Sequence, residues 1–246
     1  MIVSDLMTRE VHSLPPSAPL QEALALLAEH GVRHLPVVRN GLLVGIVSDR
    51  DLLAATGGVS SECIDLTLSE VMHDSPKTAG PDDTLVTASV EMGLAKIGCL
   101  PVVDDAGALL GLVSETDLLR AYLAASRDGR ISGEHDPPVE HLMTEEPRWV
   151  TPDVALVDAM LAARHQDFRH LPVLDADDHL IGMISDRDLC RELGRGTAPN
   201  TPVAQAMTRR IHSTSPGEAL TKAAERMLEH RISCLPVLRG ATLVGI

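Results

Sequence analysis

The sequence predicts an α/β (α+β) protein built from four copies of one small repeat. Each copy has a Met followed by Thr or His and, 28 residues later, a Leu-Pro-Val triplet. An apolar stretch with a central Gly follows each triplet, and in three copies it leads into Ser-x-x-Asp. Because self-similarity at a fixed period decides the architecture, the repeat is considered before any single element. The triplets begin at Leu35, Leu100, Leu171 and Leu235.

Each copy is expected to open with a strand, a turn and a helix. In copy one, apolar residues from Leu20 to Ala28 fall at i, i+3, i+4, i+7 and i+8, which is the apolar stripe of a helix. Similar stripes recur in copies three and four. A proline stands a few residues ahead of the helical region in every copy, where it can begin a helix or end a strand. These prolines are Pro16, Pro81, Pro152 and Pro216.

Two strands and a second helix should follow. In copy one, residues 34–38 and 42–47 are rich in β-branched and aliphatic side chains, and Arg39-Asn40-Gly41 separates them. Asn-Gly between two such runs is a strong hairpin signal. A second helix is expected to begin at Ser-x-x-Asp. Each copy is therefore strand, helix, strand, strand, helix, with a small three-stranded sheet.

The four copies are expected to form two pairs. A repeat this small buries too little apolar surface to be stable alone, so neighbouring copies should pack together, within one chain or across a homodimer. A linker is expected at 124–138, which is polar, contains Gly and ends in Pro137-Pro138. Copy four stops before its own Ser-x-x-Asp, and whether a C-terminal segment is missing stays open at this stage. The copies span 1–57, 66–123, 139–195 and 201–246.

Composition narrows the classes of function. The formal net charge of -14 opposes binding to nucleic-acid backbones and anionic membranes, and 1% aromatic residues leave no stacking platform for single strands. The sequence has neither a signal-like N-terminus nor a membrane-length apolar run, so a cytoplasmic location is expected. The sequence contains no Cys-x-x-Cys motif and no His cluster, so neither a metal site nor another cofactor is expected. The cysteines, expected to be inert, are Cys63, Cys99, Cys190 and Cys234.

Together these motifs resemble the cystathionine-beta-synthase (CBS) domain family, whose tandem pairs are called Bateman modules. The resemblance rests on Met-Thr, a proline before a helix, Leu-Pro-Val, the Gly-containing strand and Ser-x-x-Asp, and it covers essentially the whole chain. It implies tandem CBS-domain pairs with a regulatory role. Such pairs bind adenosine nucleotides or related molecules in the cleft between two copies, and occupancy of the cleft alters a partner protein or a fused domain.

The resemblance also implies candidate site residues. The ribose-binding Asp of the family falls on Asp51, Asp117 and Asp188, and the accompanying hydroxyls are Ser48, Ser114 and Ser185. A polar position in the first strand, close to the sugar or phosphate, falls on Ser13, Thr78 and Ser213. In copy three Trp149 stands at that position, where it could stack on the base or block the pocket.

The chemistry of these residue types suits a nucleotide. A carboxylate can accept hydrogen bonds from both hydroxyls of a ribose diol, and the first amides of a helix favour phosphate oxygens. Copies one and three also carry basic residues, so they are the stronger candidates, and a modest basic cluster favours AMP over ADP or ATP. These basic residues are Arg33, His34, Arg50, Arg169, His170 and Arg187.

Several alternatives remain open at this stage. Ser-x-x-Asp before an apolar run is also a helix-capping pattern, so these residues could serve stability alone. The basic residues could be solvated or ion-paired at the surface. The chain could then be a ligand-free structural or dimerising module, or the sensing part of a larger enzyme or transporter. Because the repeats use nearly every residue, intrinsic catalysis is not expected, and the regulated partner is unknown.

Overall fold

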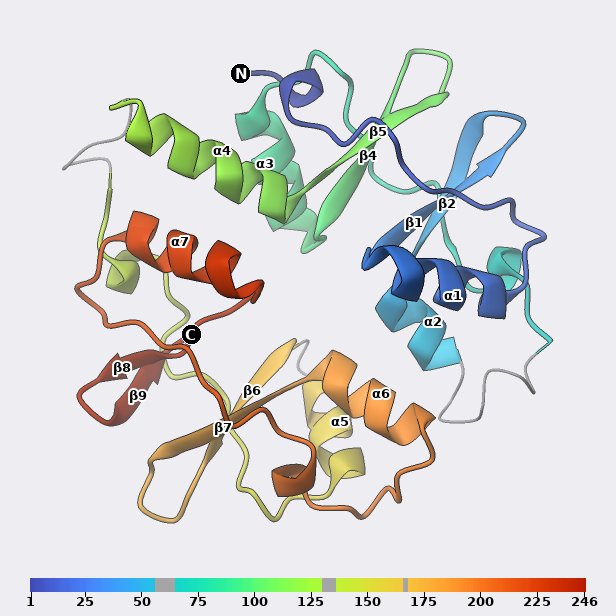
Figure 1. Ribbon diagram of the computed structural model, residues 1–246. Coiled ribbons are helices and arrows are strands. Elements are labelled where there is room, and N and C mark those ends of the chain that lie inside the picture. The colour runs from blue at the N-terminus through green and yellow to red at the C-terminus, as the bar shows by residue number, and fades with distance from the viewer. Residues whose placement is uncertain (56–64, 130–135, 166–167) are drawn as a thin grey trace. The chain divides into compact units, whose positions relative to one another are not determined.

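The computed structural model describes residues 1–55, 65–129, 136–165 and 168–246, and its helices and small sheets are shown in Figure 1. Two compact units are present, Met1–Ala121 and Tyr122–Ile246. Each unit contains two copies of the repeat, as the pairing argument predicts. The mixed α+β class is confirmed. Cys63 and part of the expected linker, 130–135, lie outside the described residues.

In the first unit, the helices and the hairpin strands follow the order expected from the sequence. Helix α4 begins in this unit and ends in the second. The helices are α1 (Leu20–His30), α2 (Asp49–Ala55), α3 (Leu85–Ala95) and α4 (Glu115–Arg127), with short 3-10 helices η1 (Val3–Asp5) and η3 (Leu68–Glu70). The strands are β1 (His34–Arg39), β2 (Leu42–Ser48), β3 (His73–Asp74), β4 (Cys99–Val103) and β5 (Leu109–Ser114).

The described part of the second unit repeats this order up to Ile246, without a counterpart of β3. Its helices are α5 (Leu156–His165), α6 (Asp186–Gly194) and α7 (Leu220–His230), with 3-10 helices η5 (Val139–His141) and η6 (Val203–Gln205). Its strands are β6 (His170–Leu174), β7 (Leu180–Ser185), β8 (Val237–Arg239) and β9 (Thr242–Gly245).

An antiparallel hairpin forms the centre of each copy, as predicted. In copy one, β1 pairs with β2 from His34 opposite Ser48 to Arg39 opposite Leu42. Asn40 and Gly41 at the turn have φ values of 54° and 83°, a conformation that Asn and Gly tolerate better than other residues. Leu35 and Val37 are buried against α1. Of the predicted stripe of this helix, Leu20, Ala23 and Leu27 are buried, whereas Ala28 is exposed.

The opening strand differs from the prediction. In each copy it is reduced to a single parallel bridge to the hairpin, such as Leu14 with Val37. A proline stands two residues after every bridge, here Pro16, and proline cannot donate to a continuing ladder. Among the described residues, a three-stranded sheet therefore occurs only in copy one, and its third strand, β3, comes from copy two.

The two copies of a unit exchange their opening segments. Val3 of copy one lies in the core of copy two, and Leu68 of copy two lies in the core of copy one; both are 0% exposed. The second unit repeats the exchange, with Val139 in the core of copy four and Val203 in the core of copy three. The copies are therefore consecutive in sequence but interleaved in space.

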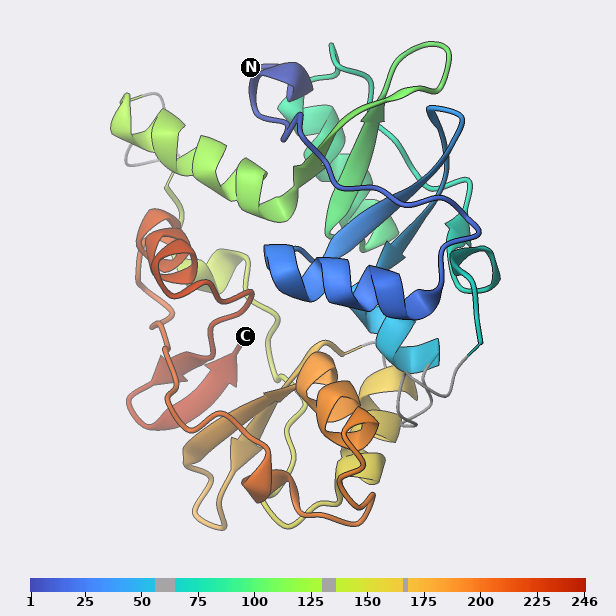
Figure 2. The ribbon, with the colours of Figure 1, turned by 45° about the vertical axis from the view of Figure 1, so that its right-hand side comes forward.

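Helix α4 extends further than the repeat boundary predicts. It runs to Arg127, so the first four residues of the expected linker, 124–127, are helical (Figure 2, yellow-green helix). The buried residues of this helix, Ala121 and Leu123, lie before the extension, at 4% and 6% exposure.

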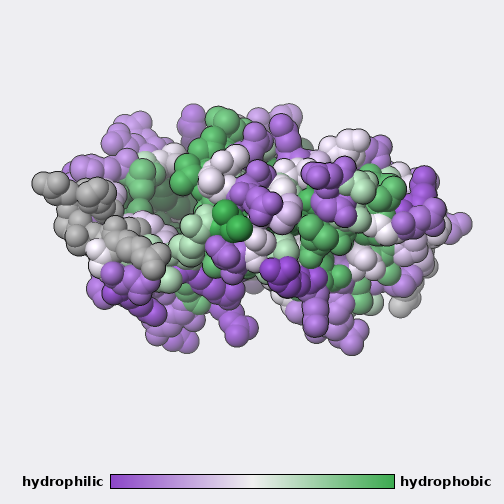
Figure 3. Space-filling model, turned by 90° about the horizontal axis from the view of Figure 1, so that it is seen from above, coloured by the Kyte–Doolittle hydropathy of each residue, from purple (hydrophilic) through white to green (hydrophobic). Residues whose placement is uncertain are grey.

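The described helices include none with the length and hydropathy of a membrane span. Hydrophobic and hydrophilic residues are interspersed over the face seen in Figure 3.

Candidate functional site

The Ser-x-x-Asp motif caps the second helix of its copy. In copy one, Oδ2 of Asp51 accepts hydrogen bonds from the backbone N of Ser48 at 2.8 Å and from its Oγ at 2.6 Å. The backbone N of Asp51 donates to Ser48 Oγ at 3.3 Å. The pairs Ser114–Asp117 and Ser185–Asp188 repeat this geometry. The capping role that the sequence left open is thus present in all three copies.

The second carboxylate oxygen of each Asp faces another donor. Oδ1 of Asp51 is 3.1 Å from Nε2 of His73. Oδ1 of Asp117 and of Asp188 lie 3.3 Å and 3.4 Å from an Arg three residues further along the same helix. The Asp side chains are 13–29% exposed, so Oδ1 is the oxygen at which a ligand hydroxyl could be accepted.

The polar position of the opening segment occupies the same place in every copy. Ser13, Thr78, Trp149 and Ser213 each come directly before the residue that bridges to the hairpin. Trp149 is 47% exposed, so its ring is accessible at this position.

An ion pair between Arg226 and Glu218 stabilises the segment around Ser213. Arg226 of α7 donates to the carbonyl oxygen of Ser213 at 2.7 Å and to both carboxylate oxygens of Glu218 at 2.8 Å. The pKa of Glu218 is lowered, chiefly by this hydrogen bond from Arg226. Thr214 also donates to Glu218. The arrangement fixes the opening segment of copy four beside its helix.

The basic dipeptides of copies one and three reach the paired copy. The carbonyl oxygen of Arg33 accepts from the backbone N of Asp49 at 3.0 Å, which places the dipeptide beside the start of α2. A side chain at Gly98 of copy two would come within 3.4 Å of Cε1 of His34. Nε2 of His170 lies 3.0 Å from Oγ of Ser233 in copy four, the position that corresponds to Gly98. The imidazoles therefore lie at the junction of two copies.

A cavity of about 470 Å³ lies between copies three and four in the second unit. Its basic lining residues are Arg148, Arg169 and His170, all from copy three. Copy four supplies hydroxyl groups from Thr214 and Ser233, and apolar side chains cover most of the wall. These apolar and sulfur-containing residues include Val139, Leu142, Met143, Phe168, Leu220, Ala223, Met227, Cys234, Leu235, Val237 and Ile246.

The cavity brings together only part of the predicted set. Arg169 and His170 line it, whereas Ser185, Arg187 and Asp188 are not among its lining residues in the described chain. The sequence reasoning missed Arg148 and Phe168. Arg148 directly precedes Trp149, at the polar position already considered, so its place next to that position is the signal that could have found it.

Of the two cysteines at the pair junctions, Cys99 is buried and Cys234 is half-buried. Burial raises the pKa of Cys234, which lines the cavity, and of Cys99 to about 12. At this pKa the thiol stays protonated at neutral pH and is a poor nucleophile or metal ligand. For these two residues the structure agrees with the inert reading of the sequence.

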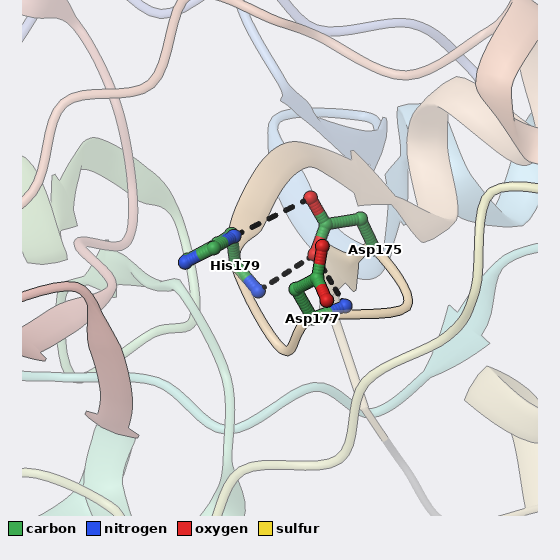
Figure 4. A group of neighbouring side chains, drawn as sticks. All are labelled: Asp175, Asp177 and His179. Atoms are coloured by element: carbon green, nitrogen blue, oxygen red, sulfur yellow. Dashed lines mark hydrogen bonds and ion pairs between the residues drawn. The ribbon is translucent and has the colours of Figure 1, made fainter.

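A cluster of two aspartates and a histidine lies at the turn of the third hairpin (Figure 4). Oδ1 of Asp175 accepts from the backbone N of Asp177 at 3.0 Å and of His179 at 2.9 Å. These bonds lower the pKa of Asp175, with the His179 amide first. Since Asp and Asn commonly bond their own backbone in turns, the cluster is explained by the turn.

Comparisons with known proteins extend over all four copies. A model of the CBS domain family matches residues 3–58, 68–124, 139–195 and 203–246. The protein MJ1225 of Methanocaldococcus jannaschii is 25% identical over 94% of this chain and 89% of its own length. An inosine-5'-monophosphate dehydrogenase of Korarchaeum cryptofilum is 37% identical over 49% of this chain, but only 24% of the enzyme is covered.

Solved structures show the same architecture. The crystal structure of MJ1225 superimposes with a TM-score of 0.84 at 24% identity, covering 100% of this chain and 95% of that one. An uncharacterized conserved protein of Pyrococcus horikoshii gives a TM-score of 0.72 at 26% identity, with the same coverage.

Proposed function

The chain belongs to the CBS domain family, and we propose that it is a regulatory module that binds adenosine nucleotides between paired copies. The main support for this proposal is the cavity of the second unit. Its volume of about 470 Å³ falls within the roughly 300–1,000 Å³ typical of small-molecule sites. Three basic side chains from copy three lie in a wall of apolar side chains from both copies, which suits a ligand with an anionic group and an apolar ring.

The ligand we favour is AMP. In this proposal, Met227, Leu235 and their apolar neighbours hold the adenine, while Arg148 and Arg169 bind the phosphate by charge-assisted hydrogen bonds. Two arginines and a histidine match a single phosphate better than the larger charge of a triphosphate. ADP and ATP remain alternatives within the same proposal.

A second contact, outside the lining of the cavity, is assigned to Asp51 in copy one and Asp188 in copy three, where each carboxylate receives a ribose. Because Oδ2 of Asp51 and of Asp188 is engaged in the helix cap, Oδ1 would accept from the ribose diol. A ligand that uses Oδ1 leaves the cap in place. In this proposal, capping and ligand binding are compatible roles of one side chain.

Calorimetric titration of AMP into the full chain tests the cavity. Arg169→Ala should weaken binding about tenfold or more, because a hydrogen bond to a charged group contributes roughly 1.5–3 kcal/mol. Arg239→Ala removes an exposed arginine of the same unit and is the matched control. Unchanged affinity in Arg169→Ala, or an equal loss in Arg239→Ala, would exclude the cavity as the AMP site.

Titrations of Asp51→Ala and Asp188→Ala test the ribose assignment. Both variants should lose binding at their copy. Ser48→Ala and Ser185→Ala weaken the same caps but keep the carboxylates, so they separate loss of the ligand contact from loss of helix stability. If each Ser variant loses as much binding as its Asp partner, the assignment of the ribose to the carboxylate is overturned.

A ligand-free structural module is the second candidate, and the observed helix caps favour it. The two candidates differ in their response to nucleotides. A ligand that binds only the folded chain raises its melting temperature by mass action. If no adenosine compound shifts the melting temperature, the structural module is the better description. We further propose that the chain acts on a partner protein and has no catalytic activity of its own.

A further inference from the structure

His73 stands where the other three copies have threonine. The residue after the repeat's Met is Thr8, His73, Thr144 or Thr208. In copies one, two and four this residue bonds through its backbone to the strand that leads into the paired copy's second helix: Thr8 pairs with Leu112, His73 with Ile46, and Thr208 with Met183. Asp51 follows Ile46 by five residues. The position therefore lies beside the helix start of the opposite copy.

The His73 side chain occupies the second oxygen of Asp51. Its Nε2 lies 3.1 Å from Oδ1, and the imidazole is 69% exposed. Since Ser48 bonds Oδ2, both oxygens of this carboxylate are engaged by donors of the chain itself.

The source of the donor distinguishes copy one. In copies two and three the donor to Oδ1 is Arg120 or Arg191, three residues along the same helix. Copy one has Ala54 at that position, so its donor comes from the paired copy. A ligand lying between the copies would approach Asp51 from the side that His73 occupies.

We propose that His73 sets the ligand affinity of the copy-one site by occupying the Asp51 oxygen that a ribose hydroxyl requires. The inference rests on the proposed function, because it assumes that Asp51 receives a ribose. A bound ribose must displace the imidazole. Because exposed ion pairs contribute little, the effect is modest, about two- to fivefold in affinity.

AMP titrations of the full chain test the proposal. The copy-one site is measured in an Arg169→Ala/Asp188→Ala background, which removes the AMP contacts proposed for the second unit. There His73→Thr, which restores the residue of the other copies, should tighten AMP binding about two- to fivefold. The reciprocal change, Thr208→His, places the same donor near Asp188 of copy three. Measured in an Asp51→Ala background, it should weaken AMP binding.

A ligand without the ribose diol separates competition for Oδ1 of Asp51 from a structural effect of His73. The affinity for 2′,3′-dideoxyadenosine monophosphate should be the same with His73 and with His73→Thr, because this compound has no hydroxyl that needs Oδ1. An equal change for both nucleotides would mean that His73 acts only on the local fold, and would overturn the proposal. Melting curves verify that each variant is folded.

The two proposals fail in different ways. If Asp51→Ala abolishes AMP binding and His73→Thr leaves it unchanged, His73 does not control the site, while the proposed function stands. If neither the wild-type chain nor His73→Thr binds AMP, the proposed function fails for this unit, and the role of His73 fails with it.

Discussion

Gly45 and Gly111 each lie under a methionine that belongs to the paired copy. A Cβ atom on Gly45 would come within 2.5 Å of Sδ of Met72, and one on Gly111 would come within 2.7 Å of the carbonyl oxygen of Thr8. The Met and the Gly of the repeat are therefore two halves of one contact between copies. Glycine is required where another part of the chain approaches the backbone this closely.

The close approach at Gly111 leads to a prediction about stability. Gly111→Ala should destabilise the first unit by about 1–3 kcal/mol, the usual cost of overpacking, because Thr8 is held to Leu112 by two backbone hydrogen bonds. Urea unfolding measures the change. Gly93→Ala is the control: this exposed residue of α3 has open space around its Cβ position, so alanine should stabilise the helix by up to about 1 kcal/mol. Equal effects at both positions would contradict the contact.

At the scale of elements, the exchanged segments make the two copies of a unit interdependent. The 3-10 helix η3 carries Leu68 from copy two into the core of copy one, where it packs with residues of α1 and β1. The segment around η1 makes the reverse contact. A unit is therefore one cooperative body rather than two adjacent domains.

Leu68→Ala tests this interdependence. The variant should lose about 2–5 kcal/mol of unfolding free energy, as is usual for a buried leucine, and hydrogen exchange should accelerate in β1 and β2 of copy one. Leu94→Ala in α3 is the matched control: its side chain is 80% exposed, so the change should stay within about 0.5 kcal/mol. Acceleration confined to copy two would show that the copies unfold separately.

For the whole molecule, the charge distribution predicts how stability depends on pH. Burial lowers the pKa of His212 below its ordinary value of 6.5, with further contributions from His230, Arg210 and Arg226. The rings of His212 and His230 are stacked, with centroids 3.6 Å apart. The pKa values of several carboxylates are lowered as well. These are Glu70, Asp136, Asp153, Asp175, Glu218 and Glu225.

Because of these pKa shifts, the free energy of unfolding falls as the pH falls. The histidine and the carboxylates act in two different pH ranges. Below the ordinary histidine value, the unfolded chain binds a proton that folded His212 resists, so stability falls first there. The carboxylates contribute stability above their ordinary values of 3.8 and 4.5, and this contribution is lost as pH falls through the lower folded values. His212→Gln should therefore reduce the loss of unfolding free energy between about pH 7.5 and about pH 5.5. The same loss in both proteins would contradict the role of His212.

Much of the fold could be predicted because the repeat fixes local structure four times over. The stripe beginning at Leu20, the Asn40-Gly41 turn and the start of α2 at Ser48-x-x-Asp51 all depend on neighbours in sequence. The reduced opening strand and the length of α4 were not predicted. The first depends on how soon a proline follows the bridge. The helix α4 continues four residues past Leu123, its last buried residue.

The sequence by itself determined the four repeats, their hairpins and helices, and the family to which they belong, because these follow from spacing and local propensity. Only the tertiary structure decided which residues of different copies meet. It placed His73 on Asp51, and it placed Arg148, Arg169 and His170 around a cavity with copy four. The physical reason is the exchange of opening segments, since each segment buries its apolar side chains in the core of the other copy and carries its polar residues with it.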